Sequence, residues 1–258
     1  MPSNSLLIAQ LTDTHLFADE SSAMMGIQSA ASLQAVADQV RSLPRQPDIV
    51  LLTGDLSQDE TPESYERLRE TIAPLGATTY WIPGNHDIPA IMQPILQDGV
   101  FQTTRGFQTG GWNVVLLDTA VPEQPFGELA EAQLTFLDQQ LQAASELPGL
   151  VVLHHPPCPV HCPCMDAIRL QNADAFYKVL DQHPQVKIVL FGHIHQEFEG
   201  DRQGVTYLGS PSTCVQLKSG SDNFEADSVL PGFRLLELFP DGRFSTRVER
   251  IPALPSQI

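Results

Sequence analysis

Short apolar runs alternate with segments of helical periodicity along the first two-thirds of the chain. The runs predict buried strands at Ser5–Gln10, Asp48–Leu52, Thr78–Ile82, Trp112–Leu117, Leu150–Leu153 and Val186–Phe191. Helices are predicted at Ser32–Val40, from Thr61 to about Ala73, at Glu128–Ala144 and at Ala173–Asp181. Strand and helix therefore alternate, which is typical of an α/β architecture with mixed sheets.

From Gly204 onward the pattern changes to strands without helices. These strands are predicted at Gly204–Leu208, Gly232–Phe239 and Phe244–Arg250, with Pro240-Asp241-Gly242 as a hairpin turn. No internal repeat, low-complexity tract or linker is visible in the sequence. We therefore expect residues 1–258 to form a single domain with a β-rich C-terminal segment, 204–250.

Five polar clusters follow the apolar runs, and six of the eight histidines lie in them. In chain order they are Asp13-Thr14-His15, Gly54-Asp55, Gly84-Asn85-His86-Asp87, His154-His155-Pro156 and Gly192-His193-Ile194-His195. Each cluster comes directly after a predicted strand. In open α/β sheets the carboxyl ends of the strands form the edge where ligands bind. We expect the five loops to meet there.

The donor chemistry of these clusters indicates metal binding. Asp, Asn and His supply the oxygen and nitrogen ligands that borderline divalent metals prefer. Any one cluster could be an ordinary turn or cap, since Asn and Asp favour such positions. Seven donors in this order suit two metal ions about 3.5–4 Å apart that share one carboxylate, as in two-metal hydrolysis of phosphate esters. The set therefore predicts a metal-dependent phosphoesterase.

The charge of the chain narrows the class of substrate. The formal net charge is −17, which argues against a nucleic-acid partner or an anionic membrane surface, since both require a basic patch. Bound divalent ions can reverse the local sign of a site, so a small anionic substrate is still acceptable. No apolar stretch reaches the roughly 18 residues of a membrane span. The stretch Met1–Ser5 has no basic signal region, so we expect a cytoplasmic protein.

Three of the four cysteines are crowded together. Cys158, Cys162 and Cys164 flank His161, and Cys214 lies apart from them. A structural zinc site at this spacing is one interpretation. Reduced thiols in a loop near the active site are the simpler one, because no second pair of cysteines follows.

The full set of clusters resembles the calcineurin-like metallophosphoesterase superfamily, and within it the bacterial class III cyclic-nucleotide phosphodiesterases of the CpdA type. The stretches that resemble this subgroup are Leu11–Leu16, Val115–Thr119, Gly192–Glu197, Ser210–Gln216, Asn223-Phe224 and Pro231–Arg234. The resemblance implies a four-layer αββα sandwich with two mixed β-sheets and a dinuclear centre.

The resemblance also implies a ligand set. The first metal would be held by Asp13, His15, Asp55 and His195, and the second by Asp55, Asn85, His154 and His193. His154 is chosen over His155 because the related ligand lies two residues before the proline. Asp87 and Asp118 either orient ligand imidazoles through the second ring nitrogen or are ordinary turn carboxylates. We expect two divalent ions per chain, iron or manganese, with zinc and cobalt as alternatives.

The expected reaction is hydrolysis of 3′,5′-cyclic AMP to 5′-AMP. A water shared by two metal ions loses its proton near neutral pH and would attack phosphorus. Asn85 would help to hold the phosphoryl oxygens, and His86 would donate a proton to the leaving oxygen. The alternatives are 2′,3′-cyclic nucleotides or other small phosphodiesters, a non-catalytic scaffold and, disfavoured by charge, a nuclease. A monomer and a homodimer are both compatible with the sequence.

Three segments without metal ligands are expected to form the walls of a base pocket. They are Phe17–Gln28, Pro159–Arg169 and Ser212–Phe233. Phe224 could stack on a purine and Asn223 could hydrogen-bond its edge, although such residues more often pack or cap a loop.

Overall fold

A computed structural model describes residues 5–254 of the chain. Most of the N-terminal stretch on which the absence of a secretory signal was judged, residues 1–4, lies outside this range. No helix within 5–254 is long and apolar enough to cross a membrane.

The first of two large sheets holds the N-terminal half of the chain and its last two strands. Its order is β16 (Phe244–Arg250), β15 (Gly232–Leu238), β1 (Leu6–Leu11), β4 (Ile49–Thr53), β5 (Thr78–Ile82) and β6 (Phe101–Gln102). Strands β1, β4, β5 and β6 run parallel, whereas β15 and β16 pair antiparallel at one side. The sheet is therefore mixed, as expected.

The second sheet holds the middle of the chain. Its order is β11 (Phe198–Arg202), β12 (Val205–Gly209), β10 (Val186–Phe191), β9 (Gly149–Leu153), β8 (Trp112–Leu116) and β7 (Gly106–Thr109). Strands β12, β10, β9 and β8 are parallel, and an antiparallel strand closes each edge. This sheet is also mixed.

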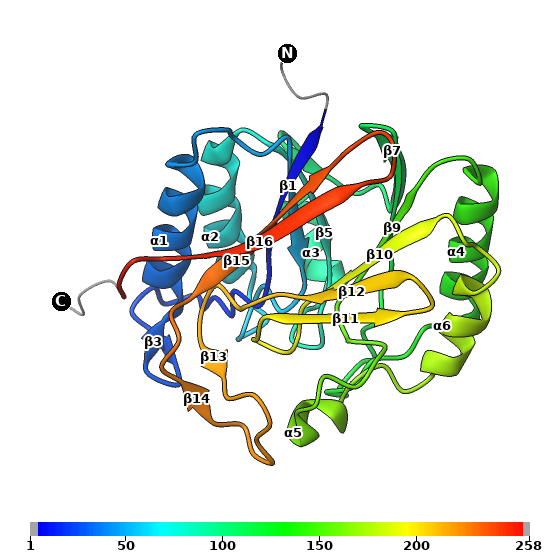
Figure 1. The fold of residues 1–258 in the computed structure, drawn as a ribbon. Coiled ribbons are helices and arrows are strands. Elements are labelled where there is room, and N and C mark those ends of the chain that lie inside the picture. The colour runs from blue at the N-terminus through cyan, green and yellow to red at the C-terminus, as the bar shows by residue number, and fades with distance from the viewer. Residues whose placement is uncertain (1–4, 255–258) are drawn as a thin grey trace.

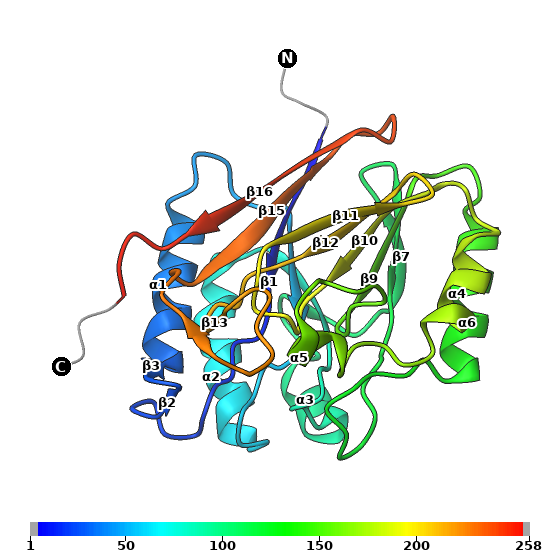
Figure 2. The ribbon, with the colours of Figure 1, turned by 60° about the horizontal axis from the view of Figure 1, so that its bottom comes forward.

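Helices cover the outer face of each sheet. Those on the first are α1 (Ser29–Arg41), α2 (Pro62–Ile72), the 3₁₀ turn η1 (Ala73–Leu75) and α3 (Pro89–Ile95). Those on the second are α4 (Glu131–Ala143) and α6 (Ala173–Leu180), with the short α5 (Pro163–Asp166) beyond them. Figures 1 and 2 show the two helical layers on opposite sides, with both sheets between them. The predicted four-layer αββα sandwich is confirmed.

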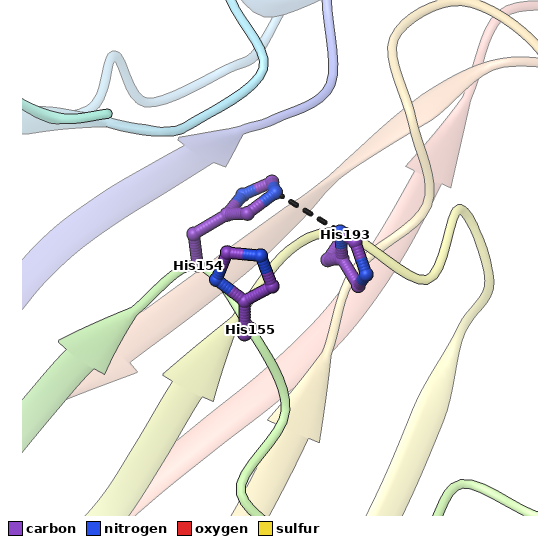
Figure 3. Close-up of side chains that lie close together, drawn as sticks. All are labelled: His154, His155 and His193. Atoms are coloured by element: carbon purple, nitrogen blue, oxygen red, sulfur yellow. Dashed lines mark hydrogen bonds between the residues drawn. The ribbon is translucent and has the colours of Figure 1, made fainter. Parts of the chain in front are cut away.

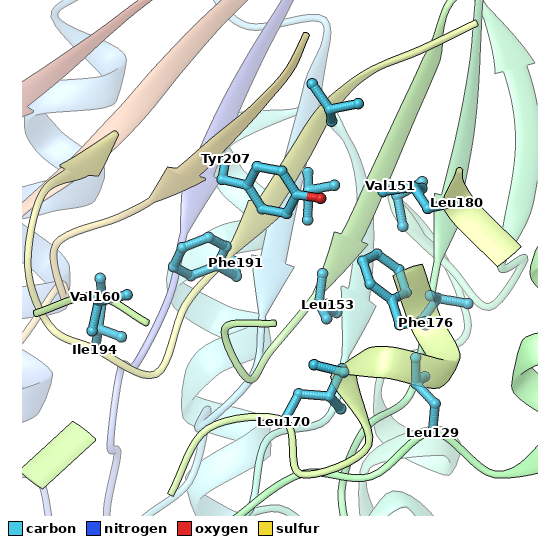
Figure 4. Packing of buried hydrophobic residues seen from close by; sticks show 14 of the residues in the cluster. Leu129, Val151, Leu153, Val160, Leu170, Phe176, Leu180, Phe191, Ile194 and Tyr207 are labelled. Carbon is cyan, nitrogen blue, oxygen red and sulfur yellow. The ribbon is translucent and has the colours of Figure 1, made fainter. Parts of the chain in front are cut away.

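Alternation along the strands explains the layers. In β1, Leu7 and Ala9 pack toward the helices of the first sheet, whereas Leu6 and Ile8 pack into the core between the sheets. Successive side chains of a strand point to opposite faces, so a continuous apolar run serves two cores. Figure 4 shows the equivalent outer core of the second sheet, in which Phe176 of α6 lies close to Leu153 of β9.

The predicted helices and central strands are found within a few residues of their expected bounds. Several elements were not predicted: α3, α5, the strands β6, β7 and β11, and two short hairpins. The hairpins are β2–β3 (Ala23–Met24 and Ile27–Gln28) and β13–β14 (Gln216–Leu217 and Ala226–Asp227). Both hairpins lie in segments expected to wall the active site.

Candidate metal centre

The five polar loops meet at one edge of the two sheets, as predicted. Asp13, Asp55 and Asn85 follow strands of the first sheet, whereas His154 and His193 follow strands of the second. Hydrogen bonds join these loops both within the first sheet and between the two sheets. The backbone N–H of Asp13 donates to Gly54 O at 2.9 Å, and that of His193 donates to Asp13 Oδ2 at 3.0 Å.

Asp13, His15 and His195 form a group that we call the first cluster. The Nε2 atoms of His15 and His195 lie 3.0 Å apart, and Asp13 Oδ1 lies 3.4 Å from His195 Nε2. His195 Nδ1 donates to Val215 O at 2.8 Å, and His15 Nδ1 donates to Gln58 Oε1 at 2.8 Å. Because each Nδ1 carries the proton of its neutral ring, each Nε2 directs a lone pair at the other.

Asn85, His154 and His193 form the second cluster. His154 Nε2 lies 3.2 Å from His193 Nδ1, which Figure 3 marks with a dashed line. His154 Nδ1 donates to Thr53 O at 2.7 Å, so Nε2 of the neutral ring is an acceptor, for His193 Nδ1–H or for a cation. Two buried polar atoms, Asn85 Oδ1 and His193 Nε2, have no hydrogen-bond partner among the described residues.

The Asp55 carboxylate lies between the two clusters. Its Oδ2 is 3.4 Å from His154 Nε2 and 3.9 Å from His15 Nε2. Its Oδ1 accepts the backbone N–H of His86 at 2.9 Å. The side chain is almost fully buried, so its charge acts in a medium of low dielectric constant, where its effect on both clusters is large.

Burial and the neighbouring charges move the histidine pKa values in opposite directions. Burial lowers the pKa of His154, but Asp55 outweighs this effect and raises it to about 9. Burial, aided by His195, lowers the pKa of His15 to about 4. Burial would raise the pKa of Asp13, but His195 and His154 bring it below its usual value. The cluster residues are therefore strongly coupled to one another.

This donor set fits divalent metal ions. In the first cluster the two Nε2 atoms face each other with no proton between them in the neutral tautomers, and that arrangement is unfavourable unless a cation accepts the lone pairs. Among residues 5–254, four groups of three Asp or His side chains have ligand atoms within 4.8 Å of one another. Imidazole, carboxylate and amide oxygen together suit iron, manganese, zinc or cobalt.

The backbone at this site adopts unusual conformations. Positive φ angles occur at five of the seven predicted ligands, namely Asp13, His15, Asp55, His193 and His195, with values between 45° and 68°. The glycines nearby permit close approach. A Cβ atom on Gly84 would overlap Asp55 Oδ1, and one on Gly54 would overlap the His154 ring.

Asp87 and Asp118 do not orient ligand imidazoles, so that interpretation is wrong. Asp87 accepts the backbone N–H groups of Leu56, Ser57 and Gly84 at 2.9–3.1 Å and the Tyr65 hydroxyl at 3.1 Å. It therefore clamps the loop that carries Asp55. Asp118 accepts the N–H of Ala120 at 3.0 Å. In the described part of the chain, neither carboxylate accepts an imidazole proton.

His155 lies beside the second cluster but faces a different partner. Its Nδ1 is 2.8 Å from the Thr119 hydroxyl, and its ring centroid is 4.6 Å from that of His193. His154, in contrast, lies within 3.4 Å of the Asp55 carboxylate. His155 also belongs to a group with His154 and His193 whose ligand atoms lie within 4.8 Å of one another, so the choice of His154 as the ligand stays a prediction.

The cysteines do not form a metal site in the structure. All four are free, and Cys162 Sγ lies 3.6 Å from Cys164 Sγ. Within residues 5–254, no cysteine belongs to a group of three side chains that could hold a metal ion. The geometry gives the zinc interpretation no support, and the interpretation as reduced thiols stays a prediction.

A cavity of about 260 Å³ opens beside both clusters. Outside the metal-binding motifs its lining is apolar and consists of Met24, Met25, Pro125, Met165, Ile168, Leu217 and Phe224. Each of the three segments expected to wall a base pocket contributes to this lining. Asn223 is not part of it, so its expected contact with a base has no support.

Gln58 was not singled out in the sequence. It contacts His15 and, at 3.4 Å, His86. A lone glutamine three residues after Asp55 carries no recognisable signal, because its role depends on two partners that are distant in sequence.

Comparison with known proteins agrees with this geometry. The calcineurin-like phosphoesterase family model matches residues 6–197. The chain belongs to this family. The resemblance predicted from the sequence is thus confirmed, and with it the class of enzyme, a metal-dependent phosphoesterase.

Individual relatives narrow the comparison. A 3′,5′-cyclic-nucleotide phosphodiesterase from Nostoc sp. is 46% identical over 95% of this chain and 92% of its own length. The 3′,5′-cyclic adenosine monophosphate phosphodiesterase CpdA of Escherichia coli K12 is 42% identical over 95% and 89%, respectively. The chain is therefore similar over nearly its whole length to proteins of the predicted CpdA-type subgroup.

Solved structures share the fold. A dimetal phosphatase from Danio rerio superposes with a TM-score of 0.71 at 15% identity, covering 95% of this chain and 96% of that one. A purple acid phosphatase from yellow lupin gives a TM-score of 0.69 at 13% identity, covering 98% and 52%. At such identities these structures support the architecture alone.

Proposed function

We propose that this chain hydrolyses 3′,5′-cyclic AMP to 5′-AMP with two divalent metal ions. The observation that carries the proposal is the pair of facing imidazole contacts, at 3.0 and 3.2 Å, with the Asp55 carboxylate near both. The relatives named as cyclic-nucleotide phosphodiesterases support the substrate.

Seven side chains would hold the two ions. One ion would be held by Asp13, His15, Asp55 and His195, and the other by Asp55, Asn85, His154 and His193. Bound ions of this kind neutralise charge on the phosphoryl oxygens and lower the pKa of a coordinated water. Iron and manganese are our first candidates, with zinc and cobalt as alternatives, because all accept nitrogen and oxygen ligands.

His86 is our candidate for the donor to the departing 3′ oxygen. Its side chain lines the cavity next to both clusters, and its backbone N–H is fixed by Asp55 Oδ1. The 3′ oxygen of a ribose is a basic leaving group, so a hydrogen-bond donor at this position lowers the barrier to its departure. Positioned donors of this kind contribute roughly 10²–10⁴-fold to the rate.

The apolar part of the cavity would receive the nucleobase. Phe224 is about half exposed at its rim, and an aromatic ring there provides a stacking surface of the kind that accepts any base. The apolar character of the cavity wall favours a second candidate function. The wall outside the metal-binding motifs carries no polar side chain, so 2′,3′-cyclic nucleotides and other small phosphodiesters would also fit.

Initial rates on three substrates test the proposal. Manganese-loaded protein would be assayed with 3′,5′-cyclic AMP, 2′,3′-cyclic AMP and bis(p-nitrophenyl) phosphate, with Asp55→Ala as the control for contaminating activity. Preference for 3′,5′-cyclic AMP, abolished in the control, supports the proposed function. Hydrolysis of the generic diester with little activity on 3′,5′-cyclic AMP favours the second candidate, and inactivity on all three substrates with both ions bound contradicts both.

A further inference from the structure

The thiols of Cys162 and Cys164 face each other behind the apolar wall of the cavity. Their Sγ atoms lie 3.6 Å apart at the start of α5. Cys162 is fully buried, whereas Cys164 is 8% exposed. Both belong to the same apolar core as Met165 and Leu217, which line the cavity, but neither cysteine is among the described residues of the lining. The pair therefore lies directly beneath this wall.

The same two residues hold the tip of the β13–β14 hairpin. Cys164 Sγ lies 3.5 Å from Asn223 O, and Cys162 Sγ lies 3.6 Å from Lys218 O and from Ser221 O. The backbone N–H of Cys164 donates to Ser221 O at 3.4 Å. Carbonyl oxygens only accept, so the thiols donate their S–H protons to the hairpin. Figures 1 and 2 show this tip beside α5.

Few other groups fasten this hairpin tip, which we define as residues 218–225. Within the described part of the chain, the hydrogen bonds that join the tip to other segments end on Cys162, Cys164 or Gln196. Phe224 belongs to the tip and is 53% exposed at the rim of the cavity. The position of this ring therefore depends on the two cysteines.

We propose that Cys162 and Cys164 form a dithiol modification site, at which a low-molecular-weight disulfide such as oxidised glutathione produces an intramolecular disulfide that releases the hairpin tip. Release of the tip displaces Phe224 and weakens the binding of a nucleobase. This effect on the substrate rests on the proposed function. The modification itself and the release of the tip depend only on the two thiols and the hairpin.

Two thiol–disulfide exchanges account for all atoms and electrons. The more exposed Cys164 loses its proton to water and attacks oxidised glutathione, which forms a mixed disulfide and expels one glutathione thiolate. Cys162, whose sulfur is 3.6 Å away, then loses its proton and attacks the Cys164 sulfur, which expels the second glutathione thiolate. Two protein thiols are oxidised, one glutathione disulfide is reduced, and the two protons pass through water to the glutathione thiolates.

Closing the disulfide removes what holds the tip. The sulfur atoms must move from 3.6 Å apart to about 2.05 Å, and a disulfide has no S–H group to donate. The carbonyls of Lys218 and Asn223 then lose their sulfur donors. Burial raises the pKa of the Cys164 thiol to about 11. Because the thiolate is the attacking species, the exchange is slow and the site responds to sustained oxidation.

Peptide mapping of zinc-loaded protein tests the chemistry. Zinc has no redox chemistry, so the oxidant acts on the thiols and not on the metal. After exhaustive treatment with excess oxidised glutathione, we expect a Cys162–Cys164 disulfide, detected as the loss of two hydrogen atoms and reversed by dithiothreitol. A disulfide to Cys158 or Cys214, a persistent glutathione adduct, or unreacted thiols at both positions overturns the proposal.

Hydrogen exchange followed by mass spectrometry measures the release of the tip without any assay of activity. The backbone amides of Cys164, Lys218 and Glu225 are hydrogen-bonded in the structure. We expect them to exchange at least about tenfold faster in the oxidised protein, because local opening sets the rate. Exchange in the β2–β3 hairpin should not change. Unchanged exchange at residues 218–225 in protein that carries the disulfide contradicts the release.

Steady-state kinetics test the consequence for the substrate. We expect oxidation to raise KM for 3′,5′-cyclic AMP about tenfold, since stacking on an aromatic ring contributes at least that much to binding, with kcat changed less than about twofold. In Phe224→Ala the same oxidation should raise KM less than about twofold, because the stacking ring is already absent. A tenfold rise in Phe224→Ala, or a loss of kcat with both ions retained, contradicts the assignment to Phe224.

Two serine variants separate the pair from the other cysteines. Cys164→Ser keeps a hydroxyl that donates to Asn223 O but forms no disulfide, so we expect the same KM before and after treatment. Cys158→Ser is the matched control, because its half-buried thiol takes no part in the pair, and it should keep the full response. A response that persists in Cys164→Ser, or that disappears in Cys158→Ser, overturns the proposal. The peptide map of the wild-type protein decides the chemistry even where a variant folds poorly.

The modification site and the proposed function fail in distinguishable ways. Absence of activity on 3′,5′-cyclic AMP, with the disulfide and the faster exchange both present, contradicts the proposed substrate and leaves the modification site standing. Normal hydrolysis of 3′,5′-cyclic AMP by protein in which Cys162 and Cys164 form no disulfide contradicts the modification site alone.

Discussion

The two clusters of the candidate metal centre differ in how their imidazoles are held. In the first cluster, both rings have a partner at the second nitrogen, Gln58 for His15 and Val215 O for His195. In the second cluster, His154 is held by Thr53 O, whereas His193 Nε2 has no partner within residues 5–254. Partners of this kind typically change metal affinity by 10–100-fold. The first cluster is therefore the better preorganised of the two.

The clusters also differ in their connection to the fold. The first is assembled from both sheets, since Asp13 and His15 follow β1 and His195 follows β10. Both imidazoles of the second follow strands of the second sheet, and Asn85 and the shared Asp55 reach it from the first sheet. An ion in either cluster would thus tie the two sheets together, but through different residues.

Removing the carboxylate that both clusters share should abolish metal binding at both, and with it the difference between their metal affinities. Asp55→Ala deletes a ligand from both, so we expect loss of both ions and a fall in kcat/KM of about 10³-fold or more, because metal chemistry supplies several kcal/mol. Metal analysis together with initial rates measures both effects. Retention of two ions with near-normal rates would contradict the shared role of Asp55.

Removing one imidazole from one cluster at a time should reveal the difference between the metal affinities of the two clusters. His195→Gln and His193→Gln each remove one imidazole, and we expect each variant to lose about one equivalent of metal and roughly 10²-fold in rate. The ion that remains should be held more tightly in His193→Gln than in His195→Gln. Equal affinities in the two variants would show that the unpartnered His193 Nε2 is without consequence.

His86 belongs to neither cluster, which makes it a control for both. We expect His86→Ala to lower kcat on 3′,5′-cyclic AMP by about 10²-fold with both ions retained. The loss should be much smaller on bis(p-nitrophenyl) phosphate, whose leaving group is stable without a proton donor. Loss of metal in this variant would mean that His86 is a ligand and not a donor.

The smallest expected effect is a difference between the metal affinities of the first and second clusters in the unmodified protein. Titration with a chelator, followed by metal analysis at equilibrium, should remove one ion before the other, with dissociation constants about 10–100-fold apart. The weaker ion is expected in the second cluster. A single unresolved step would indicate that the coupling through Asp55 outweighs the difference in imidazole support.

The sequence predicted the central elements of the fold because their patterns are unambiguous. Thr78–Ile82, Val186–Phe191 and Phe244–Arg250 have the predicted bounds in the structure. The edge strands β7 and β11 were missed because they are largely polar and partly exposed. What makes them strands is a neighbour with which to pair, and the local sequence does not show that neighbour.

The sequence predicted the side chains that would bind the metal ions, but not the groups that hydrogen-bond to those side chains and orient them. Polar residues directly after apolar strands revealed the seven expected ligands, which the structure brings together. The groups that orient their imidazoles are the carbonyls of Thr53 and Val215 and the amide of Gln58. Any residue can supply a carbonyl, so this part of the site leaves no mark in the sequence. Asp87 and Asp118 were proposed in their place because carboxylates are easier to recognise.

The five left-handed residues at the centre have a consequence for how such proteins evolve. A left-handed conformation costs a non-glycine residue on the order of 1–2 kcal/mol, so the five together oppose folding by an amount comparable to the net stability of a typical domain. Glycine at any of these positions would relieve that strain while deleting a ligand. Selection for stability alone would therefore erode this site first. Family members that have lost catalysis are expected to carry glycine at the positions equivalent to Asp13, His15, Asp55, His193 and His195 more often than elsewhere in the chain.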